Sequence, residues 1–484
     1  MPQQSTPGGR QLGQEIGSEG FSQEDFAQFR DRLTRETKLL RTAFARGDLA
    51  HDGPVIGLEL EAWLIDHNFF PSPHNQSFLE RLGDPSVVPE LSLFNIEINA
   101  PICTIEGRGL ETMHQHLSAT IRKCSANAHD DVDTVIAIGM LPTLREEDLT
   151  IEAITPSNRY AALNREVERA RNGAPVHIDI ANPSPGGAHF TASYQDVMLE
   201  AATTSFQLHL QVPCEDLWRF YNASIVLCAP LIAIAANSPF LFGKPLWQET
   251  RIPVFEQSLG EVEGPPRVTL GSAYMGPDPT AIFSENLDDY PVLLPFCSDD
   301  PIEKFPCLKL HNGTIWRWVR PIVGLDDKGT PHVRIEQRVL PAGPSSLDMM
   351  ANAAFYFGAV HALADDLGEA MPDVSFETAR ANFYAAAQLG LDAEMDWPSA
   401  GNKCRAAEVV QHLIPLAESG LRAQGMAEDL IDKYLSTISM RLATGQTGAA
   451  WQLAHFEAHG DLNKLTADYL EHQRTGMPVH EWTI

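Results

Sequence analysis

The segment Gly57–Asp66, GLELEAWLID, alternates apolar and polar side chains with the two-residue period of a β-strand. Its leucines share one face with Ala62, whereas Glu59 and Glu61 share the opposite face with Trp63. Two carboxylates at positions i and i+2 of one strand lie about 7 Å apart and repel each other. A divalent cation placed against them converts that repulsion into binding. The segment therefore predicts a strand with one buried face and one acidic, metal-binding face.

The same alternation recurs in the segments Leu93–Asn99 (LFNIEIN), Ser205–Val212 (SFQLHLQV) and His332–Leu340 (HVRIEQRVL). An antiparallel sheet with one solvated face gives such a pattern as well. These polar faces, however, lack lysine and carry Glu, Gln, His and Arg, which favours a face that holds Mg²⁺ or Mn²⁺. Because the faces carry no cysteine, a structural zinc site is not expected. Their polar residues are Asn95, Glu97, Asn99, Ser205, Gln207, His209, Gln211, Arg334, Glu336 and Arg338.

The order of the segments predicts an α+β fold in three parts. Residues 1–20 form a disordered lead-in, and residues 21–345 form a catalytic core that opens with a helix from Phe21 to about Gly47, capped by Ser22. Residues 346–484 form a helical section packed on that core. Its expected helices are Ser346–Gly368, Phe376–Met395, Cys404–Gly425, Ala427–Thr444 and Asn463–Thr475.

Composition excludes several classes of protein. A formal net charge of −29 argues against nucleic acid as a partner, because phosphate binding needs clustered Lys and Arg. Seven cysteines without a CxxC pair predict reduced thiols in the cytoplasm. The N-terminus lacks the apolar region of a signal peptide. The longest apolar stretch, Ala223–Ala236, is too short to span a bilayer, so a buried helix is expected instead of a membrane segment. No GxSxG, HExxH or HRDxxxxN motif is found.

Loops between the strands collect donors for anions. Asn237–Phe240 is followed by Lys244 and Arg251, and the segment His311–Arg320, HNGTIWRWVR, adds Thr314 and further arginines. Arginine binds phosphate or carboxylate through two parallel hydrogen bonds, although a single arginine is more often a surface ion pair. The segment Asn182–Phe190, NPSPGGAHF, has the glycines of a phosphate-binding loop but matches neither GxxxxGK(S/T) nor GxGxxG, so a phosphate loop and an ordinary loop or lid both stay open.

With these segments in place, the chain resembles the glutamate–cysteine ligase family, nearest to the branch shared by plants and many bacteria. SFQLHLQV and AIAANSPFLFGKP (Ala233–Pro245) are the most specific matches, supported by ExE in the first strand, by HNGTIWRWVR and by RIEQR. The resemblance covers about residues 55–345 and continues more weakly into NFYAAAQLGLDAEM and TGQTGAAWQ of the helical section. It implies a glutamine-synthetase-like core, in which a curved antiparallel sheet holds two or three Mg²⁺ ions.

The resemblance also implies roles for individual residues. Metal ligands would be Glu59, Glu61, Glu97, His209 and Glu336. His209, Gln207 and Arg338 would face the nucleotide, whereas Arg251, Arg320 and Thr314 would bind the substrate. Arg338 and Arg251 would act in catalysis. Tyr160 matches an RY element whose role cannot be assigned from sequence.

The implied activity is ATP-dependent ligation of the glutamate γ-carboxylate to an amine, with cysteine as the acceptor and an acyl phosphate as the intermediate. Partners would then be ATP, glutamate and the amine, with a homodimer left open. Three alternatives remain: a ligase for another amine, a phosphotransferase on a related fold, and a binding protein without activity. If one metal bridges Glu59 and Glu61, replacing either by Gln should abolish activity without a loss of stability.

Overall fold

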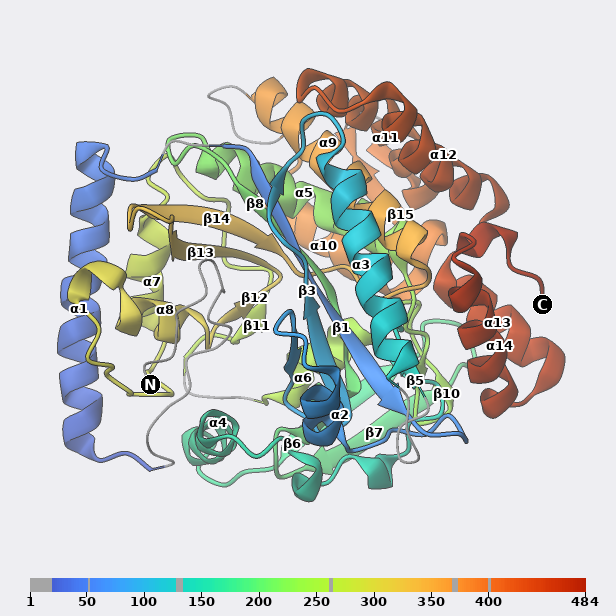
Figure 1. Ribbon diagram of the computed structural model, residues 1–484, viewed down its shortest axis with the longest axis horizontal. Coiled ribbons are helices and arrows are strands. Elements are labelled where there is room, and N and C mark those ends of the chain that lie inside the picture. Colours follow the sequence, from blue (N-terminus) through green and yellow to red (C-terminus); the bar gives the residue numbers. More distant parts are fainter. Residues whose placement is uncertain (1–19, 51–52, 128–133, 261–263, 368–372, 399–401) are drawn as a thin grey trace.

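The computed structural model describes residues 20–50, 53–127, 134–260, 264–367, 373–398 and 402–484. All of the expected lead-in except Gly20 lies outside these residues. A curled, eight-stranded antiparallel sheet occupies the centre, with helix α1 at one edge of the molecule and the C-terminal helices at the other (Figure 1). The strand order is β13-β14-β8-β1-β3-β2, and β4 and β5 also pair with β1. The strands are β1 Val55–Ile65, β2 Val87–Pro89, β3 Asn95–Asn99, β4 Cys103–Thr104, β5 Thr134–Ile136, β8 Phe206–Gln211, β13 Val319–Leu325 and β14 Pro331–Gln337.

The four alternating segments are the strands β1, β3, β8 and β14, and the predicted α+β class with an antiparallel sheet is confirmed. Their apolar residues Leu60, Ile96, Leu208 and Ile335 are each 0% exposed, as expected for the side of the sheet that is covered by helices. The register aligns the polar residues across the other side. Glu61 pairs with Glu97, and Glu59 pairs with Gln207. His209 pairs with Glu336.

Two long helices pack against the sheet. Helix α5 (Leu217–Ala235) contacts β13 and β14, and helix α9 (Ser346–Leu367) contacts α5 and β8. By length and composition α5 would pass for a membrane span, but 94% of its apolar window is buried within the protein. It is apolar on all sides because it is enclosed between the sheet and other helices. The prediction of a buried helix is therefore confirmed.

The N-terminal helix was located correctly. Helix α1 (Gln23–Arg46) begins with a capping box in which Ser22 accepts from the Asp25 backbone N–H, and it ends at Gly47 in the left-handed conformation. It packs against α7 (Ala281–Asp289) and α8 (Pro306–Asn312).

The helical section departs from the sequence prediction at three places. The expected helix Phe376–Met395 ends at Leu389, because Gly390 has a positive φ of 58°. The expected helix Cys404–Gly425 begins only at Ala406, because the preceding residues pair in a two-stranded hairpin. Helix α13 (Gly448–His459) was not predicted. The section contains α10 Phe376–Leu389, β15 Glu394–Trp397, β16 Asn402–Arg405, α11 Ala406–Ala423, α12 Glu428–Thr444, α13 and α14 Leu462–Thr475. The division at residue 345 stays a prediction.

The segment NPSPGGAHF forms the connection between β6 (Val176–Ala181) and β7 (His189–Tyr194) and the start of β7. The Asn182 side chain fixes this turn by donating to the carbonyls of Pro245 and Leu246. The other elements are α2 Asn75–Leu82, α3 Gly109–Ala126, α4 Asn158–Ala170, β9 Phe240–Leu241, β10 Lys244–Pro245, α6 Arg251–Ser258, β11 Val268–Thr269, β12 Trp316–Arg317 and the short 3₁₀ helix η3 Met198–Ala202.

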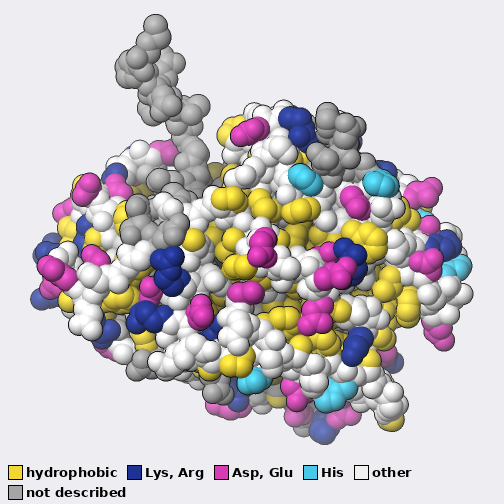
Figure 2. Space-filling view, turned by 90° about the horizontal axis from the view of Figure 1, so that it is seen from below, with side chains coloured by type: hydrophobic (Ala, Val, Ile, Leu, Met, Phe, Trp, Pro, Cys, Tyr) yellow, Lys and Arg dark blue, Asp and Glu magenta, His cyan; other side chains and the backbone are white. Residues whose placement is uncertain are grey.

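Charges are mixed over the surface. On the face shown in Figure 2, Lys and Arg side chains are interspersed with acidic ones and do not gather into one patch. This distribution agrees with the acidic composition of the chain.

Candidate active site

The polar face of the sheet carries two groups of potential metal ligands. Glu59, His209 and Glu336 form one group, called here the histidine cluster. Glu61 and Glu97 form the other with Glu90, a residue that the sequence prediction missed; it is called here the carboxylate cluster. Within each cluster the ligand atoms lie within 4.8 Å of one another. The sheet register produces this division, because Glu59 and Glu61 pair with different partners.

In the histidine cluster, His209 Nε2 lies 3.1 Å from Glu59 Oε1 and 3.9 Å from Glu336 Oε1. Although Nε2 is buried and close to both carboxylates, it makes no hydrogen bond. Neighbouring ligands of a magnesium ion, each about 2.1 Å from the metal, are about 3 Å apart. The donor set of one imidazole and two carboxylates therefore fits a divalent cation. Arg334 Nε donates to Nδ1 of the same ring at 3.1 Å, which places the proton of the neutral ring on Nε2. Nε2 can therefore bind a cation only after this hydrogen bond is broken and the proton has left Nε2.

Cations balance the carboxylates of the histidine cluster. Arg320 binds Glu336 through two hydrogen bonds, Nε to Oε2 at 2.7 Å and Nη2 to Oε1 at 3.1 Å, and Arg338 Nη1 donates to the same Oε2 at 3.1 Å. Burial alone would raise the pKa of Glu336, but Arg320 and Arg338 hold it well below its usual range. Burial also opposes ionisation of Glu59, yet the neighbouring His209 lowers the pKa of that carboxyl overall.

The carboxylate cluster has less compensation. Glu61 accepts from the Ser205 backbone N–H at 2.7 Å and from Gln207 Nε2 at 2.8 Å. Burial and the charge of Glu90 nevertheless raise the pKa of Glu61 to about 7. Burial, together with Glu59 and Glu90, raises the pKa of Glu97 well above its usual range. Three carboxylates with raised pKa values, one of them buried and two half-buried, are also a donor set for a hard cation, because the ion removes their repulsion.

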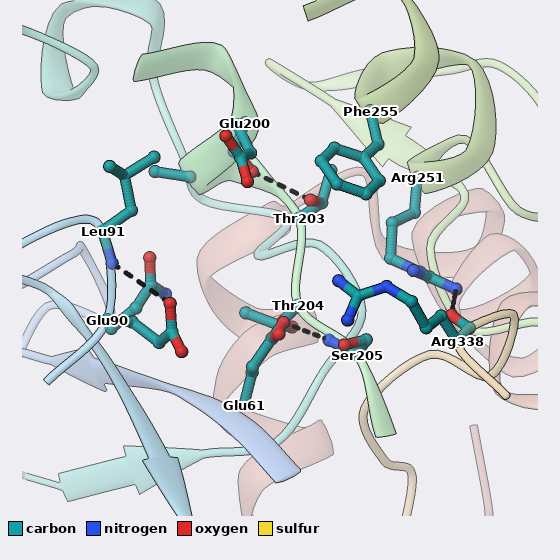
Figure 3. A pocket seen from close by; sticks show the side chains of 12 residues that line it. Glu61, Glu90, Leu91, Glu200, Thr203, Thr204, Ser205, Arg251, Phe255 and Arg338 are labelled. Atoms are coloured by element: carbon teal, nitrogen blue, oxygen red, sulfur yellow. Dashed lines mark hydrogen bonds between the residues drawn. The ribbon is translucent and has the colours of Figure 1, made fainter. Parts of the chain in front are cut away.

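A small cavity of about 50 Å³ opens beside the carboxylate cluster (Figure 3). Glu61 and Glu90 line one side, and Arg251 and Arg338 line another. Other lining residues are Leu91, Asn95, Glu200, Ala201, Thr203, Thr204, Ser205 and Phe255.

Two arginines of this cavity are held in place from behind. Arg251 Nε donates to the fully buried Glu249 at 3.2 Å, and its Nη2 donates to the Val339 carbonyl at 2.5 Å. Arg338 Nη1 contacts both Gln207 and Glu336, which links the cavity to the histidine cluster. These contacts orient the guanidinium groups before any ligand arrives.

The structure gathers nine of the ten predicted site residues on this face. Thr314 is the exception, because its hydroxyl donates to the His311 carbonyl at 2.8 Å and contacts Arg267. Among the described residues, the hydrogen-bond partners of the Thr314 side chain are His311 and Arg267, and neither belongs to a cluster. The gathered residues are Glu59, Glu61, Glu97, Gln207, His209, Arg251, Arg320, Glu336 and Arg338.

Sequence reasoning missed several residues of the site. Glu90 directly follows the short edge strand β2, where too few residues alternate to give a signal. Glu200 is the single acid in the apolar stretch MLEAA. An isolated acid among apolar residues could have marked it as a candidate site residue. Tyr160, left without a role, proves to be close to the acids: burial and the charges of Glu90 and Glu97 raise its pKa well above the usual range.

Solved structures share this fold. A glutamate–cysteine ligase from Francisella tularensis, crystallised in complex with AMP, matches with a TM-score of 0.59 and 12% identity, over 88% of this chain and 89% of that one. A bifunctional glutathione synthetase from Pasteurella multocida matches with a TM-score of 0.53 and 12% identity, over 87% of this chain and 52% of that one. No curated protein matches the sequence. Together with a family match over residues 55–468, this fold assigns the chain to the ATP-dependent carboxylate–amine ligases.

The family follows from the sequence match. The model of glutamate–cysteine ligase family 2 matches residues 55–468, and the chain belongs to this family. The match extends well beyond residue 345, into the helical section that showed only a weak resemblance.

Proposed function

We propose that this protein joins the γ-carboxylate of glutamate to the amine of cysteine, with cleavage of ATP to ADP and phosphate. The observation that carries the proposal is the face shared by the two clusters and by Arg251, Arg320 and Arg338. Such a face suits a reaction in which a polyanion must meet a second anion, because the barrier to that encounter is mainly electrostatic.

The reaction has two steps. The γ-carboxylate attacks the γ-phosphorus of ATP, the bond to the β–γ bridging oxygen breaks, and ADP leaves. The acceptor amine then attacks the acyl carbon, and phosphate leaves as the amide bond forms. Arg338, fixed by Gln207 and Glu336, is positioned to stabilise charge on the phosphoryl group. Arg251, fixed by Glu249, is positioned to bind an anionic group in the cavity.

Magnesium is the proposed cofactor, with Mn²⁺ as a substitute and two or three ions bound. The histidine cluster and the carboxylate cluster would hold two of them. When bound, such ions neutralise the phosphates and align the attack. Gln207 and Ser205 keep Glu61 oriented toward its cluster through the two hydrogen bonds described above.

The proposal is tested by measuring ADP and free phosphate with Mg²⁺, glutamate and a panel of amines. Glutamate should be required, cysteine should give the highest kcat/KM, and ADP and phosphate should appear in equal amounts. A higher kcat/KM for another amine would keep the ligase chemistry and reject cysteine as the acceptor. A phosphorylated product without free phosphate would reject the ligase mechanism, and no glutamate-dependent ADP with any amine would reject the function.

A further inference from the structure

Glu200 lies in the cavity wall without a role in either metal cluster. It belongs to η3, whose other residues Met198, Leu199, Ala201 and Ala202 are at most 4% exposed. This short helix packs against α6, the helix that carries Arg251. Because its neighbours are anchored in the core, the backbone holds Glu200 at the cavity and cannot easily turn it away (Figure 3).

The carboxylate of Glu200 is not satisfied by the protein. Its Oε2 is shielded from solvent and has no hydrogen-bond partner among the described residues. A polar atom that is shielded from solvent and has no partner is costly, and each such atom in a native structure calls for an explanation. Asn95, which is 3% exposed, presents a second such atom in the same cavity, because its Nδ2 has no partner either. The cavity therefore presents an acceptor and a donor that can form hydrogen bonds with a ligand.

Acidic and basic side chains lie on different sides of the cavity. In Figure 3, Glu200 and the guanidinium group of Arg338 lie on opposite sides of Thr203, Arg251 lies beyond Phe255, and Ser205 lies beside Arg338. The arginines attract the anionic end of a ligand. Burial and the charge of Glu90 raise the pKa of Glu200 to about 8, so a cationic end bound beside it would favour the ionised carboxylate. At about 50 Å³ the cavity suits a small polar head group and not a nucleotide.

We propose that Glu200 binds the ammonium group of the acceptor amine. This inference rests on the proposed ligase function and extends it to a residue that holds the second substrate. An amine in neutral water is mostly protonated, so it enters the site as a cation. Glu61 and Glu90 belong to the carboxylate cluster, which leaves Glu200 as the remaining carboxylate that lines the cavity in the described part of the chain.

The test compares a charged acceptor with an uncharged one. Hydroxylamine is uncharged at neutral pH and attacks an acyl phosphate to give a hydroxamate. In Glu200→Gln, which keeps the size of the side chain, KM for cysteine should rise about tenfold to a hundredfold, as for the loss of a charged hydrogen bond. Hydroxamate formation from ATP, glutamate and hydroxylamine should keep its wild-type rate. Glu200→Asp should recover part of the cysteine affinity, because it restores the charge.

Controls separate this role from a structural one. Glu166→Gln removes a buried carboxylate that pairs with Arg169 on α4, and it should leave both activities unchanged. Calorimetric titration of cysteine onto the enzyme with Mg²⁺ and ADP gives a readout independent of turnover, and Glu200→Gln should weaken that binding by the same factor.

Each outcome decides the inference. An unchanged KM and unchanged binding of cysteine in Glu200→Gln would overturn it, as would an equal loss with cysteine and with hydroxylamine. If the wild-type enzyme forms neither product nor hydroxamate, the proposed function fails first, and the binding measurement alone then decides whether Glu200 recognises an ammonium group.

Discussion

The two clusters carry the same residue type on the same sheet and differ in how their charge is balanced. In the histidine cluster, Arg320 and Arg338 bind Glu336, and His209 lies beside Glu59. In the carboxylate cluster, the hydrogen bonds to Glu61, Glu90 and Glu97 come from Ser205, Gln207, Leu91 and Asn99, which are neutral donors. The pKa values of Glu59 and Glu336 are therefore lowered, whereas those of Glu61 and Glu97 are raised.

This difference shows that strand alternation places carboxylates on one face but does not determine how their charge is balanced. The histidine cluster can remain ionised without a metal, because the protein supplies the countercharge. In the carboxylate cluster the raised pKa values favour protonated carboxyl groups until a cation binds. For Glu59 the comparison reverses the sequence-based expectation about stability: its replacement removes a partner of His209 and not a source of repulsion.

The largest effect is expected for catalysis in the carboxylate cluster. Glu61→Gln should reduce glutamate-dependent ADP formation by about 10³ or more, because a metal ligand is lost while the hydrogen bonds to the backbone remain. The fold should persist, as measured by circular dichroism and melting temperature. Wild-type turnover in this variant, or full wild-type activity in EDTA, would contradict the metal assignment.

The second effect is on the free energy of unfolding. Replacing a glutamate should lower it in the histidine cluster but not in the carboxylate cluster. Glu336→Gln leaves Arg320 and Arg338 buried without their countercharge and should cost about 3–5 kcal/mol. Glu97→Gln should leave stability unchanged or raise it, because it relieves repulsion. Both are measured by urea unfolding without metal. An equal loss of unfolding free energy in the two variants would contradict the proposed difference in charge balance between the clusters.

A third prediction concerns Arg338, which contacts Glu336 and also Gln207, the partner of Glu61. Arg338→Lys should lower kcat about a hundredfold with little change in ATP affinity, because lysine keeps the charge but lacks the planar donor pair. Arg317→Lys is the matched control, since Arg317 is also buried but pairs with Glu285. Normal turnover of the Arg338 variant would exclude this residue from the mechanism.

The smallest effect is a pH dependence of stability in the metal-free protein. The pKa of Glu61 is raised from 4.5 to about 7 by burial and by Glu90, so the folded state binds this proton more tightly than the unfolded state. The contribution is present below about pH 4.5 and is lost as the pH rises through about 7. Relative to Glu61→Gln, the wild-type protein should lose at most about 3 kcal/mol over that range.

Magnesium provides the check on this titration. Saturating Mg²⁺ should flatten the difference between the wild type and Glu61→Gln, because the ion stabilises the ionised carboxylate. Parallel stability curves for the two proteins without metal would show that Glu61 does not hold an extra proton.

Much of the fold could be predicted because alternation is a local property of the chain. Glu59, Glu97, His209 and Glu336 were assigned to one face from spacing alone, and the strand register confirms it. The hairpin before Ala406 was missed because its two four-residue strands are too short to outweigh the helical pattern around them. Glu90 and Glu200 were missed because neither lies within an alternating strand.

The sequence by itself determined which side of each strand is apolar, where α1 begins, and which family the chain resembles. The first two properties follow from the order of neighbouring residues, and the resemblance follows from short sequence motifs. Only the tertiary structure decided that Glu59 joins His209 while Glu61 joins Glu90, and that Thr314 lies apart from both. Strand register and loop position bring together residues up to about 280 positions apart, and electrostatic balance depends on such distances through space and not on distance along the chain.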